Sequence, residues 1–107
     1  MYNDVIYLVT KTSTKNEVGD QIEKAVETMR FAKLKSIGQS EFYQAQALGL
    51  KPEIKFVLPD YLDYENQEEV IYNGFRYKVL RTFQTGNEIE IVCYGGVRAE
   101  VVASGDS

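Results

Sequence analysis

The sequence predicts a mainly β (all-β) fold, a small antiparallel β-barrel or sandwich of about six strands with one short inserted helix. Short apolar and β-branched runs recur along the chain, turn signals separate them, and hairpin sequences fill the second half. Only one segment repeats its apolar residues at helical spacing. The 107 residues suffice for one domain. We expect that domain over residues 1–95 and a loose tail over residues 96–107.

The first third is expected to hold two strands joined by a mobile loop. Residues 5–10 (VIYLVT) are continuously apolar or β-branched, which is typical of a well-buried strand. Residues 11–21 are polar and contain a turn signal at Gly19-Asp20, which predicts a loop. A second strand is expected over residues 26–37. A bulge near Phe31-Ala32 would restore its alternation of inward and outward side chains.

The helix is expected near residues 40–48. Phe42, Ala45 and Leu48 recur at every third position. Ser40 is a suitable N-cap, and Gly49 can take the left-handed conformation that follows a last helical turn. One apolar stripe of this width is too narrow to hold a helix alone, so the helix must lie against the sheet or another subunit.

Four further strands are expected in the second half. Residues 52–59 alternate cleanly, and their flanking prolines favour a short or edge strand. Residues 60–69 are acidic and predict a loop. The strands at 69–72 and 75–83 are joined by Asn73-Gly74, a strong hairpin signal. One face of the second of these should carry Phe75, Tyr77, Val79 and Phe83.

The sixth strand is expected over residues 88–94. Its alternation places Ile89, Ile91 and Cys93 in the core and Glu88 and Glu90 on the solvent face. A free cysteine in such a position behaves as a small hydrophobic residue rather than a reactive thiol. Alternating glutamates on a solvent face are commoner than a catalytic pair of carboxylates, so we predict no catalytic residues here.

Composition excludes several classes of function. The chain has no histidine, which excludes imidazole-based catalytic triads and histidine-ligated zinc, and its single cysteine excludes an internal disulfide. No apolar run is long enough for a membrane span or a signal peptide, so a cytoplasmic location is expected. The net charge of −4 and the lack of a basic stripe argue against tight, autonomous nucleic-acid binding.

The acidic run DYLDYENQEE at residues 60–69 is the one candidate cation site. Hard cations need clustered carboxylates, but this run lacks the spacing and the glycine of an EF-hand loop. The thirteen tyrosines and phenylalanines could form a base-stacking platform, yet most are spaced as core residues without interleaved basic residues. We therefore expect no metal, no cofactor and no enzymatic activity.

A set of motifs between residues 37 and 94 resembles the head-tail joining proteins of tailed bacteriophages, also called head closure or stopper proteins. That family has an S-x-E-F/W-x-x-A-x-x-x-G motif, whose serine stands one place out of register here. The matching residues, in chain order, are Glu41, Phe42, Ala45 and Gly49, Lys51-Pro52-Glu53, Asp60-Tyr61 or Asp63-Tyr64 with Glu65, Tyr72, Gly74, Tyr77 and Val79, and Ile89-Glu90-Ile91.

The resemblance implies a virion protein assembled in the bacterial cytoplasm. It implies a homo-oligomeric ring below the portal or adaptor that closes the DNA channel, touches packaged double-stranded DNA passively and docks the tail. Candidates for the channel or gating segment are Glu41, Phe42, Ala45, Leu48 and Gly49. Candidates for contact with other subunits or partners are Lys15, Asn16, Asp60, Asp63 and Glu65. The connector at residues 36–50 is the segment expected to rearrange.

Two other functions stay open at this point. One is a small OB-like module that binds single-stranded nucleic acid or a protein partner, and its signature would be binding that weakens steeply with salt. The other is an enzyme of unknown type, which would need a convergent polar pocket. We also expect the isolated protein to be a monomer or a weak oligomer, because the sequence has no uninterrupted apolar patch for an obligate interface.

Overall fold

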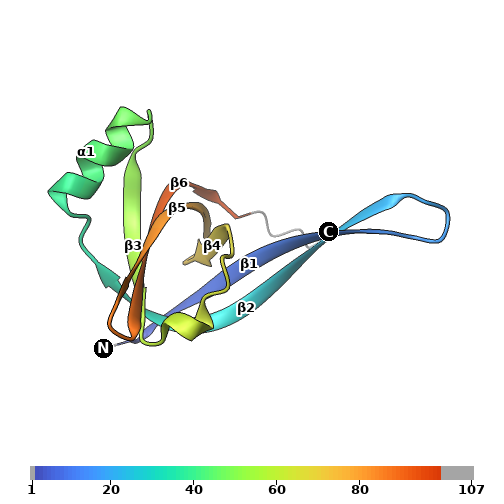
Figure 1. The fold of residues 1–107 in the computed structure, drawn as a ribbon, viewed down its shortest axis with the longest axis horizontal. Coiled ribbons are helices and arrows are strands. Elements are labelled where there is room, and N and C mark those ends of the chain that lie inside the picture. The colour runs from blue at the N-terminus through green and yellow to red at the C-terminus, as the bar shows by residue number, and fades with distance from the viewer. Residues whose placement is uncertain (1, 100–107) are drawn as a thin grey trace.

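A computed structural model, in which residues 2–99 are described, shows a closed barrel of six antiparallel strands (Figure 1). Around the barrel the strands follow the order β1-β2-β3-β6-β5-β4, and β4 pairs with β1 to close it. The predicted all-β class with one short helix is confirmed. The elements are β1 (Asp4–Lys15), β2 (Gln21–Lys35), α1 (Gln39–Ala47), β3 (Pro52–Leu58), a 3₁₀ turn (Tyr61–Asp63), β4 (Glu69–Tyr72), β5 (Phe75–Thr85) and β6 (Glu88–Arg98).

The core fills the barrel and draws on every strand. Phe56 of β3 is fully buried, and its ring meets that of Tyr72 edge-on at a centroid distance of 5.3 Å. This arrangement is favourable for two aromatic rings. The other buried members of the cluster are Ile6, Leu8, Ala32, Leu58, Val70, Ile89, Ile91 and Cys93. The predicted inward positions of β6 are therefore confirmed.

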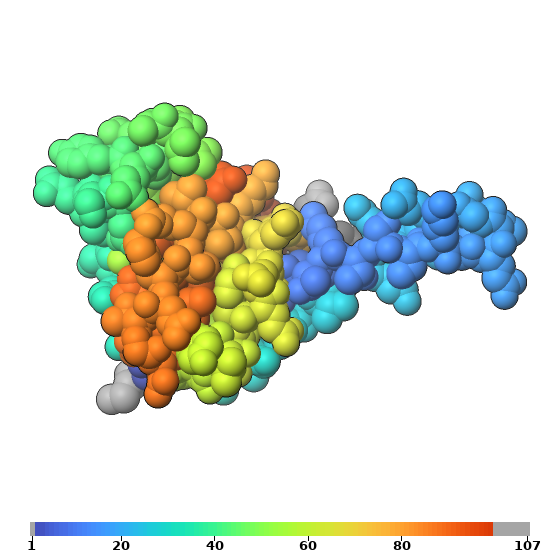
Figure 2. Space-filling view, in the orientation of Figure 1, coloured from blue at the N-terminus to red at the C-terminus, as the bar shows by residue number. Residues whose placement is uncertain are grey.

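The segment predicted as a mobile loop, residues 11–21, is instead mostly strand. β1 runs to Lys15 and β2 begins at Gln21, in continuous register from Asp4↔Ala32 to Lys15↔Gln21. A turn at residues 16–20 joins them, with Gly19 at φ +88°. The sequence of this part is polar because every residue from 11 to 27 is exposed, so neither face required apolar side chains. The hairpin stands clear of the barrel in Figures 1 and 2.

β2 needs no bulge near Phe31-Ala32, contrary to expectation. The strand pairs with β1 up to Ala32 and with β3 from Lys33 to Lys35, so it changes partner where the alternation was expected to break. Register shifts occur instead in β6 pairings, between Pro52 and Ile54 of β3 and twice along β5. These shifts separate the four aromatic and apolar residues expected on one face of β5. Tyr77 and Val79 pack against the core, whereas Phe75 and Phe83 are exposed.

β3 is an interior strand and not an edge. It pairs with β6 over its whole length and with β2 at three positions. Its prolines are tolerated because Pro52 opens the strand and Pro59 follows its last residue. The predicted hairpin at Asn73-Gly74 is confirmed, with φ of 53° and 82°, the positive values that a two-residue type I′ turn requires.

The prediction places the start of the loose tail, at residue 96, too early in the chain. β6 continues to Arg98, and residues 97 and 98 pair with β5 at Arg76 and Phe75. Gly96 also donates its backbone N–H to the Glu53 carboxylate at 2.8 Å. The remainder of the predicted tail, residues 100–107, lies outside the described residues. The acidic stretch 60–69 is a loop as predicted, apart from its short 3₁₀ turn.

Candidate functional site

Helix α1 begins one residue earlier than predicted and has a different N-cap. Gly38, rather than Ser40, is the N-cap residue, and its carbonyl accepts from the Phe42 N–H at 3.0 Å. The Glu41 carboxylate accepts from the Gly38 backbone N–H at 2.8 Å, so it satisfies a donor at the helix start. Gly49 adopts the predicted left-handed conformation, with φ +75°.

The helix rests on the outside of the barrel through Glu41 and Ala45. Ala45 is 1% exposed and Glu41 is 8% exposed, whereas Leu48 is 72% exposed. The predicted apolar stripe of Phe42, Ala45 and Leu48 is therefore only partly the buried face. Leu48 contributes instead to an open groove between the helix and β5, which is lined by Gln44, Ala45, Leu48, Leu80 and Arg81.

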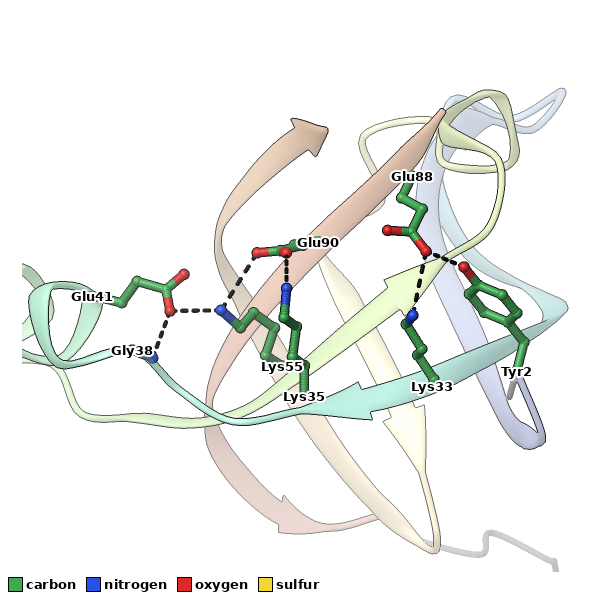
Figure 3. A network of polar contacts seen from close by, with 8 residues as sticks. All are labelled: Tyr2, Lys33, Lys35, Gly38, Glu41, Lys55, Glu88 and Glu90. Atoms are coloured by element: carbon green, nitrogen blue, oxygen red, sulfur yellow. Dashed lines mark hydrogen bonds and ion pairs between the residues drawn. The ribbon is translucent and has the colours of Figure 1, made fainter. Parts of the chain in front are cut away.

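A buried ion pair joins this helix to β3. Lys55 Nζ lies 2.7 Å from Glu41 Oε1 and 3.4 Å from Glu90 Oε1 (Figure 3). The Lys55 side chain is 7% exposed, that of Glu41 10% and that of Glu90 14%. Removal of such charges from water costs several kcal/mol, which close pairing and additional hydrogen bonds must offset.

Sheet register explains why two carboxylates gather here. Lys35 of β2 stands directly opposite Lys55 of β3 on the outer face of the barrel, and like charges in opposed positions repel. Glu90 of β6 lies within reach of both, with its other oxygen 2.7 Å from Lys35 Nζ. Glu41 supplies the second negative charge from the helix. The four side chains together are electrically neutral.

A second, more exposed cluster continues the network along the same face. Glu88 Oε2 lies 3.4 Å from Lys33 Nζ and accepts a hydrogen bond from the Tyr2 hydroxyl (Figure 3). Glu88 and Glu90 of β6 face outward, as predicted, but both are paired with lysines, Glu90 with Lys55 of the neighbouring β3 and both glutamates with lysines of β2, the next strand beyond it. The solvent face predicted for these two glutamates therefore carries a network of ion pairs.

The surroundings hold these carboxylates ionised. Burial acts to raise the pKa of Glu41, but the hydrogen bonds from Lys55 and from the Gly38 N–H outweigh it, and the pKa is lowered. The hydrogen bond from Lys35 lowers the pKa of Glu90, with a further contribution from the charge of Lys55. The hydrogen bond from Tyr2 lowers the pKa of Glu88. Ionised carboxylates held by lysines serve as anchors and are poor proton donors at neutral pH.

Other groups that could carry chemistry are placed as follows. Cys93 is fully buried in the core, and burial raises the pKa of its thiol to about 12, which leaves it protonated and unreactive. Within residues 2–99, no group of three or more metal-ligating side chains comes together. None of the helices formed by this part of the chain has the length and hydrophobicity to cross a membrane.

The candidate partner-contact residues fall on two separate surfaces. Lys15 and Asn16 lie at the far end of the projecting hairpin, where Asn16 Oδ1 accepts from the N–H groups of Val18 and Asp20. Asp60 caps the 3₁₀ turn by accepting from the Leu62 N–H at 2.9 Å. Asp63 pairs with Arg30 at 3.8 Å, and Glu65 is exposed beside them.

The buried Lys55 and its role in anchoring the helix were missed at the level of sequence. Lys55 occupies an outward position of an alternating strand, which is normally solvated, and nothing in its neighbours along the chain marks it as covered. One usable signal existed. Glu41 follows Gly38 by three residues, which is the spacing of a capping-box carboxylate. No protein-family model matches the chain, and no curated protein sequence is detectably similar to it.

Proposed function

We propose that the protein is a structural virion protein of the head-tail joining, or head closure, type in a tailed bacteriophage. Copies form a ring below the portal or adaptor, close the DNA channel after packaging and receive the tail. The observation that carries the proposal is the ordered set of motif residues between positions 37 and 94. They lie on α1, β3, the 3₁₀ turn, the β4–β5 hairpin and β6, or in the segments that connect these elements, which follow one another along the chain.

Two features of the molecule support this role. The net charge of −4 suits a channel through which DNA must slide, because each added lysine or arginine would raise the affinity for phosphate. The projecting hairpin and the externally mounted helix extend away from different parts of the barrel (Figure 1). Such extensions are suited to contacts with neighbouring subunits.

The connector between β2 and β3, which carries α1, is proposed to rearrange when the ring forms. Helix α1 has nine residues, too few for stability in isolation, so its position depends on what it packs against. In the single chain the contacts that hold the helix are buried Ala45, the Glu41–Lys55 ion pair and a hydrogen bond from Arg81 to Gln44. New partners in a ring would compete with these contacts and shift the balance between two positions of the helix.

Deletion of the gene from the phage or prophage that encodes the protein tests the function directly. We expect heads without tails, heads that lose packaged DNA, and free tails in the same lysate, with rescue by the wild-type gene supplied in trans. Genes for portal, capsid and tail-tube proteins beside this one are the corresponding genomic expectation. Infectious, tailed particles made without the gene would refute the proposal. Salt-sensitive binding of single-stranded DNA would favour an OB-like module instead.

The rearranging connector has its own test. Residues 42–48 are replaced by a Gly/Ser linker, and the barrel is checked for cooperative unfolding. We expect heads that carry this variant to lose DNA after packaging. Retention of DNA at the wild-type level would show that the helix only covers one side of the barrel.

A further inference from the structure

The projecting hairpin, here called the arm (residues 11–26), is a two-stranded ribbon with two uncovered faces. An isolated ribbon of two strands is only marginally stable in water, so an extended one usually gains from packing on another surface. One of its faces is rich in β-branched side chains, which fit a pleated surface that is half buried. That face, here called the arm face, consists of Thr12, Thr14, Ile22, Lys24 and Val26.

A second uncovered surface lies at the base of the same ribbon. On the outside of the barrel, Val5 stands opposite Phe31, and Tyr7 stands opposite Met29. These four residues, here called the apolar patch, are 36%, 53%, 38% and 46% exposed, in that order. At about 200 Å² for a fully exposed large side chain, they leave roughly 300 Å² of surface in one place, and patches of this size are often functional.

The two surfaces cannot meet within one chain. Side chains along a strand alternate between its faces, and the patch occupies odd-numbered positions of β1 and β2 whereas the arm face occupies even-numbered ones. They therefore lie on opposite faces of one continuous ribbon. The arm face continues the side of the ribbon that carries Ile6 and Leu8 into the barrel core. Contact between arm face and patch requires a second copy.

The two surfaces also match in form and charge. Each is two strands wide, so the arm can lie on the patch as one sheet packs on another. Glu27 lies next to Met29 along the patch side of β2 and is exposed, so it gives the patch an acidic edge. Lys24 stands in the middle of the arm face, between Ile22 and Val26 in sequence, and offers the complementary charge.

We propose that the arm of one copy packs its arm face on the apolar patch of the next copy, so that the chain associates with itself head to tail. Two different surfaces make a heterologous contact, and repetition of such a contact produces a ring or a filament. The patch supplies less than half of the roughly 800 Å² per partner of a standard stable interface, so the contact is weak alone. This contact would serve the ring of the proposed function, but it rests on the two surfaces and not on that function.

Sedimentation velocity of the full chain tests the contact. The wild type is expected as a monomer at about 5 µM and as a concentration-dependent oligomer at several hundred µM. Ile22→Ser/Val26→Ser, which alters the arm face, and Tyr7→Ser/Phe31→Ser, which alters the patch, should each remain monomeric. Their equimolar mixture should form dimers and nothing larger, because only one intact arm and one intact patch are then available to each other.

Each other outcome overturns the proposal. Association retained by the arm variant and lost by the patch variant would mean that patches pair with each other. A wild type that is monomeric at all concentrations would mean that the two surfaces do not bind. All of these results are independent of the deletion phenotype, so the contact and the proposed function can fail separately.

Disulfide trapping covers the case in which a variant fails to fold. Thr12→Cys on the arm and Val5→Cys on the patch are prepared as separate proteins, since Cys93 is buried and does not interfere. Under mild oxidation at high concentration, the mixture should yield a mixed disulfide dimer in clear excess over either homodimer, identified by intact mass. Equal yields of all three dimers would contradict head-to-tail packing.

Discussion

The substitution Lys55→Met keeps the aliphatic packing of the buried lysine and removes its charge. Glu90 retains Lys35 at 2.7 Å, but Glu41, whose side chain is 10% exposed, retains only the Gly38 N–H. Loss of one partner of a buried pair costs about 3–5 kcal/mol because a charge is left buried without compensation. Relief of the repulsion between Lys35 and Lys55 returns up to ~1 kcal/mol.

A net loss of about 3 kcal/mol in the free energy of unfolding is therefore expected, and urea denaturation at pH 7, followed by circular dichroism, measures it. With a urea slope of about 1.5 kcal/mol per M, the midpoint falls by roughly 2 M. The helix can also undock locally and hydrate Glu41. In that case the urea midpoint moves less, and hydrogen exchange of the amides in α1 accelerates by about 100-fold, which corresponds to the same loss of about 3 kcal/mol.

Two control variants make the result specific. Lys35→Met removes a lysine whose side chain is 55% exposed, and it should cost less than about 1 kcal/mol. Lys55→Met/Glu41→Gln removes both charges, and it should recover most of the loss because a neutral pair needs no compensation. If Lys55→Met changes neither the midpoint nor helix exchange, the ion pair does not anchor the helix.

Three other predictions follow from the same structure. Because the pKa values of Glu41 and Glu90 are lowered in the folded protein, their ionised forms contribute stability that is complete above pH 4.5 and is lost as the pH falls through the folded-state pKa values. Measurement of the unfolding free energy between neutral and acidic pH should show this loss, and the loss should be smaller in Glu41→Gln. Cys93, with its pKa raised to about 12, should react with a thiol reagent at pH 8 only as fast as the barrel unfolds, and rapid native-state labelling would contradict its burial. Gly96→Ala should lower the unfolding free energy by about 1–3 kcal/mol, because the added Cβ would lie 2.5 Å from Tyr77 Cε1. Thermal melts should show that Gly96→Ala costs less stability when it is made in a Tyr77→Leu variant than when it is made in the wild type.

Local signals in the sequence were sufficient to predict much of the barrel. Asn73-Gly74 located a hairpin, and the alternation of Ile89, Ile91 and Cys93 oriented β6 correctly, because both depend on neighbouring residues alone. Residues 11–21 are predicted as a loop because they are polar, whereas residues 11–15 and 21–26 form strands that have no core to face. The burial of Lys55 depends on a helix that crosses above it, and contacts of that kind have no local pattern.

The arm also determines how the chain tolerates changes in length. Its tip, residues 16–20, touches no part of the core, so residues inserted there leave the barrel wall unaltered. Alternation along a strand has a period of two. Lengthening each strand of the arm by two residues preserves which side chains share a face, whereas lengthening by one exchanges the faces beyond the insertion. Related chains can therefore differ in the reach of this hairpin in steps of four residues while the barrel stays the same.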